Sequence, residues 1–571
     1  MQRRGPDDAG VWSQEDRGIA LAHRRLSIID PGADGHQPMA TADGCLRVVF
    51  NGEIYNYRAL RQELEKKGYR FRSHSDTEVL LHLYAEKGRD MVHDLRGMFA
   101  FAIWDDHKRG VLLARDSLGI KPLYYADDGH MLRVASQVKA LLSGGGIDQQ
   151  PEPAGHVGFF LWGHVPEPYT LYKGIRALGA GKTLWVDKGG VREEQRFFSL
   201  ADEFGYSKTQ ANEYNHEDIQ QQLATALRDS VSHHLIADVP VGVFLSSGLD
   251  SATLVALASE SQDQKLNTVT LGFHEYKGTE YDEVPLAEAI AGHYGTAQHT
   301  VWVEKRDFKA ELDMLLGAMD QPSIDGVNTY FVSKAAAATG LKVALSGIGG
   351  DELFAGYPGF RQIPKMVKGL GLFRCAPVIG KGFRWVSAPI IKHFTSPKYA
   401  GLLEYGGSYA GAYLLRRGLF MPWELPEILD GEMVREGWRE LQPLARLQET
   451  IDGVNTARLK VSALELTWYM RNQLLRDADW AGMAHGLEIR TPLVDTDLLR
   501  SLTPLIMSEQ PPTKKDMANT PRKILPGSVL NRPKTGFSVP VHEWLHGEES
   551  GVSIRGLRGW AVELNNSMVS E

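Results

Sequence analysis

The chain has 571 residues, which is too long for a single hydrophobic core, so we expect two or more domains. Its 43% apolar and 23% charged residues are typical of a globular protein. The net charge is −8, and the sequence has no basic run that would favour binding to nucleic acid or to an anionic membrane. The two cysteines, Cys45 and Cys375, argue against a disulfide scaffold and predict a cytoplasmic protein. No uncharged apolar stretch approaches the ~20 residues of a membrane span.

The first predicted domain covers residues 1–195 and is rich in short strands. Apolar runs place these strands at residues 19–22, 26–29, 46–50, 98–104 and 111–115. One helix carries Leu60 and Leu64 on one face, and a second is expected to begin at an N-cap, Asp76. Asn51-Gly52 predicts a turn that presents a backbone N–H outward. Many strands with few helices favour a layered α+β sandwich.

A polar stretch at residues 202–215 predicts a linker, and the second domain is expected to cover residues 205–550. Its strands are expected at 241–245, 268–273, 299–303 and 342–345, with helices at 219–231, 282–295 and 330–339. This alternation predicts a parallel sheet with right-handed crossovers, whose ligands bind beyond the carboxyl ends of the strands. The remainder is predicted to be mainly helical, and residues 551–571 are treated as a tail.

Two small-residue loops follow directly on predicted strands of the second domain. The first is Ser246-Ser247-Gly248-Leu249-Asp250-Ser251, and the second is Ser346-Gly347-Ile348-Gly349-Gly350-Asp351-Glu352. Backbone N–H groups and a helix N-terminus make such a loop a site for phosphate. Because Asp250 and Asp351 would repel a bare phosphate, a bridging Mg²⁺ is expected between pyrophosphate and these two carboxylates.

The loops belong to an ordered set of motifs that resembles asparagine synthetase. The set continues with Leu474-Leu475-Arg476-Asp477-Ala478-Asp479, Glu488-Ile489-Arg490-Thr491-Pro492 and Arg532-Pro533-Lys534-Thr535-Gly536-Phe537. The resemblance implies an α/β ATP pyrophosphatase domain, similar to the adenine nucleotide α-hydrolases, with a helical C-terminal part. It implies ATP binding by Leu245, Ser246, Ser247, Gly248, Asp250, Ser251, Leu271, Ser346 and Gly347, and Mg²⁺ binding by Asp250 and Asp351. It also implies catalytic roles for Asp351 and Lys534, whose ammonium would neutralise charge developing on the phosphates.

Three positions depart from the pattern of that family. Ser247 occupies the usual second-glycine position of the first loop, so the turn must accommodate a Cβ. Ile348 stands where well-studied members have a glutamate linked to acyl-adenylate formation and ammonia attack. Isoleucine transfers no proton, so that role is vacant or filled elsewhere. Trp480 replaces a frequent arginine, which would alter the acceptor pocket.

The first domain carries motifs in the same family order. They are Arg4-Gly5-Pro6-Asp7-Asp8, His23-Arg24-Arg25-Leu26-Ser27-Ile28, Asn51-Gly52-Glu53-Ile54-Tyr55-Asn56, Ser75-Asp76-Thr77-Glu78 and Gly97-Met98-Phe99-Ala100-Phe101. They resemble the class II glutamine amidotransferase domain of asparagine synthetase, an N-terminal-nucleophile sandwich. The resemblance implies that Arg25 binds the glutamine α-carboxylate, that Glu53 and Asp76 hold its α-ammonium, and that Asn51 and the Gly52 N–H form a catalytic oxyanion hole.

The family's nucleophile is an N-terminal cysteine upstream of the Arg-Gly-Pro-Asp-Asp motif, whereas the printed sequence begins inside that motif. The chain as written is therefore expected to hold an incomplete sandwich and to hydrolyse no glutamine. Cys45 is no substitute, because it has no free α-amino group to act as base. A truncated start is the preferred explanation, and a chain that uses free ammonia is the second.

Two further patterns resemble ligand sites. Gly181-Lys182-Thr183 lacks the upstream glycine of a phosphate-binding P-loop. His542-Glu543-Trp544-Leu545-His546 matches a zinc pattern, but Pro540 and Gly547 leave little helix to aim both histidines. We expect neither to bind a ligand.

Taken together, the motifs predict a ligase that forms L-asparagine from L-aspartate with ATP and with glutamine or ammonia. An acyl-adenylate would form with release of pyrophosphate, and ammonia would reach it through an internal tunnel. The main alternative is a related amide ligase acting on another carboxylate in polysaccharide or peptide modification, motivated by Ile348 and Trp480. A non-catalytic paralogue is the other. The acceptor and the oligomeric state stay open, with a homodimer as one option.

Overall fold

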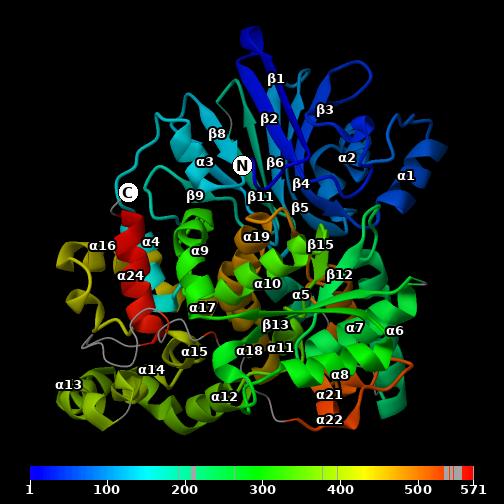
Figure 1. The fold of residues 1–571 in the computed structure, drawn as a ribbon. Helices are drawn as coiled ribbons and strands as arrows, with labels where there is room; N and C mark the ends of the chain where they lie inside the picture. The colour runs from blue at the N-terminus through cyan, green and yellow to red at the C-terminus, as the bar shows by residue number, and fades with distance from the viewer. Residues whose placement is uncertain are drawn as a thin grey trace.

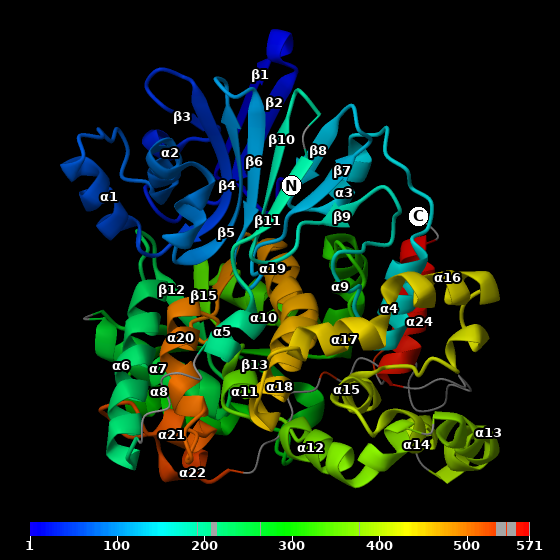
Figure 2. The ribbon, with the colours of Figure 1, turned by 180° about the vertical axis from the view of Figure 1, so that it is seen from behind.

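The computed structural model describes residues 1–190, 192–206, 214–262, 264–375, 377–394, 396–532, 539, 544 and 556–569. Most of the first third of the chain forms the sheet-rich upper part in Figures 1 and 2. The remainder, together with the helix Pro153–Trp162, forms a larger part, mostly helical, below it. No helix among the described residues has the length and apolar character needed to cross a membrane.

The central sheet of the upper part has six antiparallel strands. Their order is β11-β10-β6-β5-β4-β3, from β3 (Met39–Ala40), β4 (Leu46–Ile54), β5 (Gly97–Asp105), β6 (Gly110–Arg115), β10 (Lys182–Asp187) and β11 (Arg192–Arg196). Residues alternate along each strand between the two faces. Val48, Phe50 and Ile103 pack on one face, whereas Ala102 and Leu113 pack on the other.

Helices cover the first face of this sheet, and smaller sheets cover the second. The helices are α1 (Tyr57–Lys66) and α2 (Asp76–Lys87). The smaller sheets are β1 (Asp8–Gln14) with β2 (Ile19–Arg25), and β8 (Leu132–Ala135) with β7 (Tyr124–Asp127) and β9 (Arg176–Ala177). The layered α+β sandwich expected from the sequence is therefore confirmed.

Three local predictions in this part are wrong. Residues 26–29 form no strand, because their polar backbone atoms bond elsewhere: Ser27 N–H donates to Asp7, and the Ile28 carbonyl accepts from the Asp238 N–H. Asn51-Gly52 forms no turn and continues β4, where pairing with β5 overrides the local turn preference. The N-cap of α2 is Ser75, whose hydroxyl accepts from the Thr77 N–H, while Asp76 begins the helix.

Gly52 in β4 has a backbone conformation that L-residues with a Cβ rarely adopt, with φ at +146°. A Cβ there would lie 2.0 Å from the Met98 carbonyl oxygen. We expect Gly52→Ala to destabilise the upper part by roughly 2–4 kcal/mol, through backbone strain plus a clash with backbone. Thermal unfolding measures the loss. Gly68→Ala is the control, because Gly68 also has positive φ but faces open space. Equal losses in the two variants would contradict the clash.

A five-stranded parallel sheet forms the centre of the lower part. Its order is β14-β13-β12-β15-β16, from β12 (Val241–Phe244), β13 (Asn267–Phe273), β14 (Ala297–Val303), β15 (Val343–Leu345) and β16 (Glu488–Arg490). The parallel sheet was predicted, but β16 was not. One face packs on α6 (His216–His234), α7 (Leu249–Ser261) and α8 (Val284–Tyr294), and the other on α10 (Val327–Ala338) and α19 (Arg476–Met483).

Further helices complete the chain. They are α3 (Val138–Ser143), α4 (Pro153–Trp162), α5 (Leu200–Tyr206), α9 (Lys305–Ala318), α11 (Gly350–Leu353), α12 (Gly359–Leu370), α13 (Pro377–Phe394), α14 (Leu402–Tyr405), α15 (Tyr409–Arg417), α16 (Gly431–Leu441), α17 (Pro443–Ile451), α18 (Ala457–Leu464), α20 (Thr496–Ile506), α21 (Lys514–Ala518), α22 (Gly527–Leu530) and α24 (Leu557–Val569). A π-helical segment, Glu465–Leu475, joins α18 to α19.

Two of these helices lie where the sequence predicted an irregular linker and a tail. Helix α5 occupies the start of the predicted linker and buries Phe204, so residues 202–206 are not irregular. Helix α24 lies in the predicted tail, beside α4 in both views (Figures 1 and 2), and buries Trp560 and Leu564. The C-terminal segment therefore packs against the rest of the lower part.

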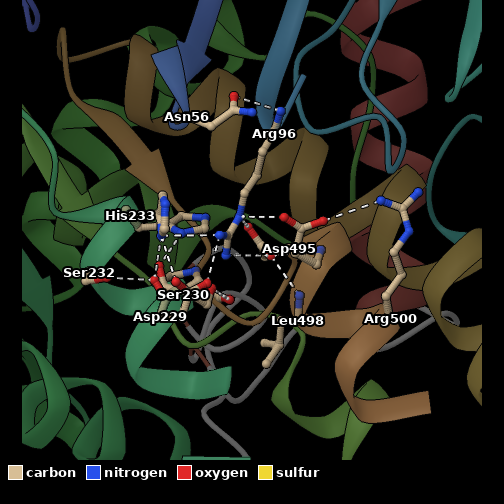
Figure 3. A network of polar contacts seen from close by, with 12 residues as sticks. Asn56, Arg96, Asp229, Ser230, Ser232, His233, Asp495, Leu498 and Arg500 are labelled. Carbon is tan, nitrogen blue, oxygen red and sulfur yellow. Dashed lines mark hydrogen bonds and ion pairs between the residues drawn. The ribbon is translucent and has the colours of Figure 1, made fainter. Parts of the chain in front are cut away.

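Arg96, just before β5, ties the upper part to the lower part (Figure 3). Its guanidinium Nε and Nη2 donate to both carboxylate oxygens of Asp495, at 3.0 and 3.1 Å, and it pairs with Asp229 of α6 at 2.7 Å. Asp495 in turn caps α20 by accepting from the Asp497 and Leu498 N–H groups. Asn56 accepts a hydrogen bond from the Arg96 backbone N–H at 3.1 Å. These contacts hold the two parts in one arrangement.

Candidate active sites

The two predicted phosphate loops lie side by side at the carboxyl end of the parallel sheet. Ser246-Ser247-Gly248 connects β12 to α7, and Ser346-Gly347 follows β15. The hydroxyls of Ser246 and Ser251 are 2.9 Å apart, and the Gly248 N–H donates to the Ser246 hydroxyl at 3.2 Å. A Cβ on Gly347 would lie 2.9 Å from Asp250 Cβ, so glycine is needed for the loops to approach.

These loops border a cavity of about 290 Å³, which we call the second-half pocket. Eight of the nine residues predicted to bind ATP line it: Leu245, Ser246, Gly248, Asp250, Ser251, Leu271, Ser346 and Gly347. The ninth, Ser247, instead accepts a hydrogen bond from Arg532. The structure thus brings residues from three strand ends to one pocket, as the topology of a parallel sheet requires.

Lys514 lies between the two aspartates predicted to bind Mg²⁺. Its ammonium is 2.5 Å from a carboxylate oxygen of Asp250 and 2.5 Å from one of Asp351. Burial opposes charge on this lysine, but the two carboxylates prevail and raise its pKa. The two acids therefore converge on one cation, and hard oxygen ligands of this kind also suit Mg²⁺.

The sequence reasoning missed Lys514, although a signal for its position exists. Thr513 and Asp516 form a capping box that starts α21 with Lys514 as the first helical residue. The lysine predicted for the phosphates, Lys534, lies outside the described residues, as do both histidines of the zinc pattern. Lys182 and Thr183 lie within β10, so the Gly-Lys-Thr sequence forms no phosphate loop.

Further carboxylates also line the second-half pocket. Asp325 and Asp477 both face it, together with the apolar Ile348. Asp477 is 2% exposed and accepts hydrogen bonds from the Trp480 indole N–H at 2.7 Å and the Ser323 hydroxyl at 2.8 Å. In the structure this carboxylate lines the pocket and hydrogen-bonds to neutral groups.

A larger cavity of about 810 Å³, the first-half pocket, lies in the upper part. All five residues predicted to bind glutamine line it: Arg25, Asn51, Gly52, Glu53 and Asp76. The Arg25 guanidinium donates to the backbone carbonyls of Ile29, Asp30 and Gly32, which fixes its orientation. Cys45, directly before β4, is not among the described residues that line this pocket.

The acids of the first-half pocket are buried. Burial raises the pKa of Asp76 to about 6, although its carboxylate accepts from the Ile54 N–H at 2.9 Å. Burial also raises the pKa of Glu53, despite an ion pair with Arg490 of β16 at 3.3 Å. Arg490 donates to Glu488 at 2.9 Å, and Glu488 pairs with Lys121 at 3.1 Å. A charged network therefore runs from the first-half pocket into the parallel sheet.

A small cavity of about 10 Å³, the linking cavity, lies between the two pockets. It shares Met483 with the first-half pocket and Ile489 with the second-half pocket. Its other lining residues are Ile120, Lys121, Leu475, Ala478, Asp479 and Thr491. Such a space is on the order of one water molecule in size. Helix α19 contributes residues to all three cavities.

Comparison with known proteins agrees with the two-part architecture. A family model described as a glutamine amidotransferase domain matches residues 1–198, and one described as asparagine synthase matches residues 222–556, more than half of the chain. Asparagine synthetase 1 of Bacillus subtilis is 32% identical over 561 residues, which cover 95% of this chain and 83% of that protein. Asparagine synthetase B of Escherichia coli is 35% identical over 382 residues, or 64% of this chain and 61% of that one.

Among solved structures, a glutamine phosphoribosylpyrophosphate amidotransferase from B. subtilis covers 53% of this chain and 86% of its own at 15% identity. Its TM-score of 0.27 is too low to bear on the fold. The family model over the second half and the identity across 95% of the chain do bear on the family. This chain belongs to the asparagine synthetase family.

Proposed function

We propose that this protein forms L-asparagine from L-aspartate, ATP and nitrogen supplied by glutamine or ammonia. The observation that carries the proposal is the pairing of two pockets through one helix. The first-half pocket collects all five predicted glutamine ligands, the second-half pocket collects eight predicted ATP ligands, and α19 borders both. The reaction itself is inferred from the relatives, which are named asparagine synthetases.

In this proposal the second-half pocket binds ATP and aspartate. Ser246, Ser251, Gly347 and the backbone of both loops bind the phosphates, and the N-terminus of α7 adds partial positive charge. Asp250 and Asp351 would hold Mg²⁺, which neutralises phosphate charge when bound. Lys514, together with Lys534, would then face the phosphates and stabilise the leaving pyrophosphate. The product of this half-reaction is an aspartyl-adenylate.

The first-half pocket would bind glutamine. Arg25 would receive the α-carboxylate, Glu53 and Asp76 the α-ammonium, and Asn51 with the Gly52 N–H the carbonyl oxygen. Ammonia that enters this half would pass along α19 through the linking cavity, which is on the order of one water molecule in size. The buried, mostly apolar walls at Ile120, Leu475, Ala478 and Met483 would keep it from water and hence uncharged.

An ATP–pyrophosphate exchange assay with a panel of carboxylates tests the proposal, with asparagine formation from ammonium salts as the second readout. Exchange that depends on aspartate, together with ATP-dependent asparagine, is expected. Exchange with a different carboxylate alone would point to the alternative ligase. Exchange with none would favour a non-catalytic paralogue and defeat both enzyme proposals.

The alternative acceptor has a specific observation in its favour. Trp480 stands where members of the family frequently have an arginine, and its indole N–H donates to Asp477. Among the described residues that line the second-half pocket there is no lysine or arginine to receive the α-carboxylate of aspartate. The panel should therefore include carboxylates without a second acidic group.

A further inference from the structure

The carboxyl groups of Asp477, which is buried, and Asp325, which is partly buried, face the second-half pocket together with Ile348. The turn that carries Asp325 packs directly on Asp477. At Gly326, where φ is +88°, a Cβ would lie 3.0 Å from Asp477 Cγ and 2.7 Å from the Trp480 ring. The Gly326 N–H donates to Asp325 at 3.0 Å. This close packing keeps the two acids beside each other at the pocket wall.

The surroundings of Asp477 raise the affinity of its carboxylate for a proton. Burial, and next the charge of Asp325, raise its pKa to about 8. Hydrogen bonds from Trp480 and Ser323 and the charge of Arg476 oppose this rise. Burial also raises the pKa of Asp325. Two such neighbouring carboxyls tend to share one proton, so that one is ionised and the other neutral.

The position of Asp477 matches the place where ammonia would arrive. Asp477 lies on α19, and the next residues of that helix, Ala478 and Asp479, line the linking cavity. Ile348, which lines the same pocket, has no group that accepts a proton. Asp250 pairs with the Lys514 ammonium at 2.5 Å. Asp477 therefore combines access to the incoming nitrogen with a high affinity for a proton.

Building on the proposed function, we propose that Asp477 is the catalytic base of amide formation, in place of the proton-transfer group that Ile348 lacks. The lone pair of ammonia forms the C–N bond at the acyl carbon, and the carbonyl electron pair moves to oxygen. The nitrogen then gives one proton to the Asp477 carboxylate. The carbonyl re-forms as the bond to AMP breaks, and AMP leaves with the electron pair. Asp477 later returns the proton to water.

Separating the two half-reactions tests this role. In Asp477→Asn, ATP–pyrophosphate exchange with the acceptor should remain within tenfold of the unchanged protein, because adenylation requires no proton transfer by this group. Amide formation should fall about 100-fold or more, the usual contribution of a general base. Hydroxylamine replaces ammonia as the nucleophile, because it is the weaker base and stays uncharged over the tested pH range. Equal losses in exchange and hydroxamate formation, or no loss, would overturn the proposal.

Two neighbouring variants test the same role through pH. In the unchanged protein, hydroxamate formation should fall as the pH drops through about 8, since the carboxylate is the active form. Asp325→Asn removes a like charge, so the fall should move to lower pH. Trp480→Phe removes a hydrogen bond that favours the carboxylate, so the fall should move to higher pH. A profile that neither variant moves overturns the proposal. If the unchanged protein shows no acceptor-dependent exchange, the proposed function itself fails.

Discussion

Replacing Lys514 by methionine is expected to lower ATP–pyrophosphate exchange by about 10²–10³-fold, the usual effect of removing one charge-stabilising group at the reacting centre. The lysine ammonium bridges Asp250 and Asp351 at 2.5 Å each, and its side chain is largely buried. Without it, the two carboxylates lose the ammonium that bridges them beside the phosphate loops. The variant therefore loses a positive charge and gains repulsion at the place proposed for pyrophosphate.

The measurement is the aspartate-dependent exchange rate as a function of Mg²⁺ concentration. Lys515→Met is the matched control, because Lys515 is the next residue of α21 and is exposed. It should leave the rate within about twofold, since an exposed charge contributes little. If saturating Mg²⁺ restored the Lys514→Met rate fully, the lysine would only occupy the metal position in the absence of the ion, and the proposed contact with phosphate would be wrong.

Local patterns predicted most of the fold because they report which residues must be buried. The apolar runs at β4, β5 and β6 were recognisable because alternate residues pack on different layers. Strand and helix alternation predicted the parallel sheet for the same reason. In contrast, β16 is a three-residue strand that forms only because it lies next to β15, far away in sequence. No periodicity can develop over so short a segment.

The site was predictable where one motif supplies both the loop and its ligands, as in Ser246–Ser251. Contacts between distant segments were not. Lys514 reaches Asp250 from 264 residues away, and Asp325 neighbours Asp477 through a turn that carries no sequence motif. At Asn51-Gly52 the local sequence predicted a turn, but pairing with β5 along the whole length of β4 keeps these residues in the strand. Tertiary packing decides such cases, and single-sequence patterns do not contain it.

Arg490→Met is expected to destabilise the protein by about 3–5 kcal/mol, the usual cost of leaving buried charges without their partner. Arg490 is fully buried between the two parts of the molecule. It pairs with Glu53 at 3.3 Å and Glu488 at 2.9 Å, and it donates to the backbone carbonyls of His234 and Ile236 at 3.0 and 2.6 Å. Its removal leaves two acids of like charge and two carbonyls without this donor.

Urea unfolding, followed by tryptophan fluorescence, measures the effect. Arg500→Met is the control, because Arg500 is half-exposed where it pairs with Glu203, and such a pair contributes at most about 1 kcal/mol. The Arg490→Met deficit should also depend on pH. The charge of Arg490 lowers the pKa of Glu53, so this pKa should rise further above its value in the unfolded chain when the arginine is removed. The ionised form of Glu53 is then unfavourable in the folded state but not in the unfolded state.

The part of the deficit due to Glu53 is therefore present above the raised pKa that this group has in the unchanged fold. It is lost as the pH falls below that pKa, because Glu53 is then protonated in the folded state of both proteins. Arg490→Met combined with Glu53→Gln should recover part of the stability at neutral pH, because the double variant removes one of the stranded charges. A deficit that is independent of pH and unchanged in the double variant would assign the loss to packing and to the two carbonyls. In that case the buried charge network would not be what joins the first-half pocket to the parallel sheet.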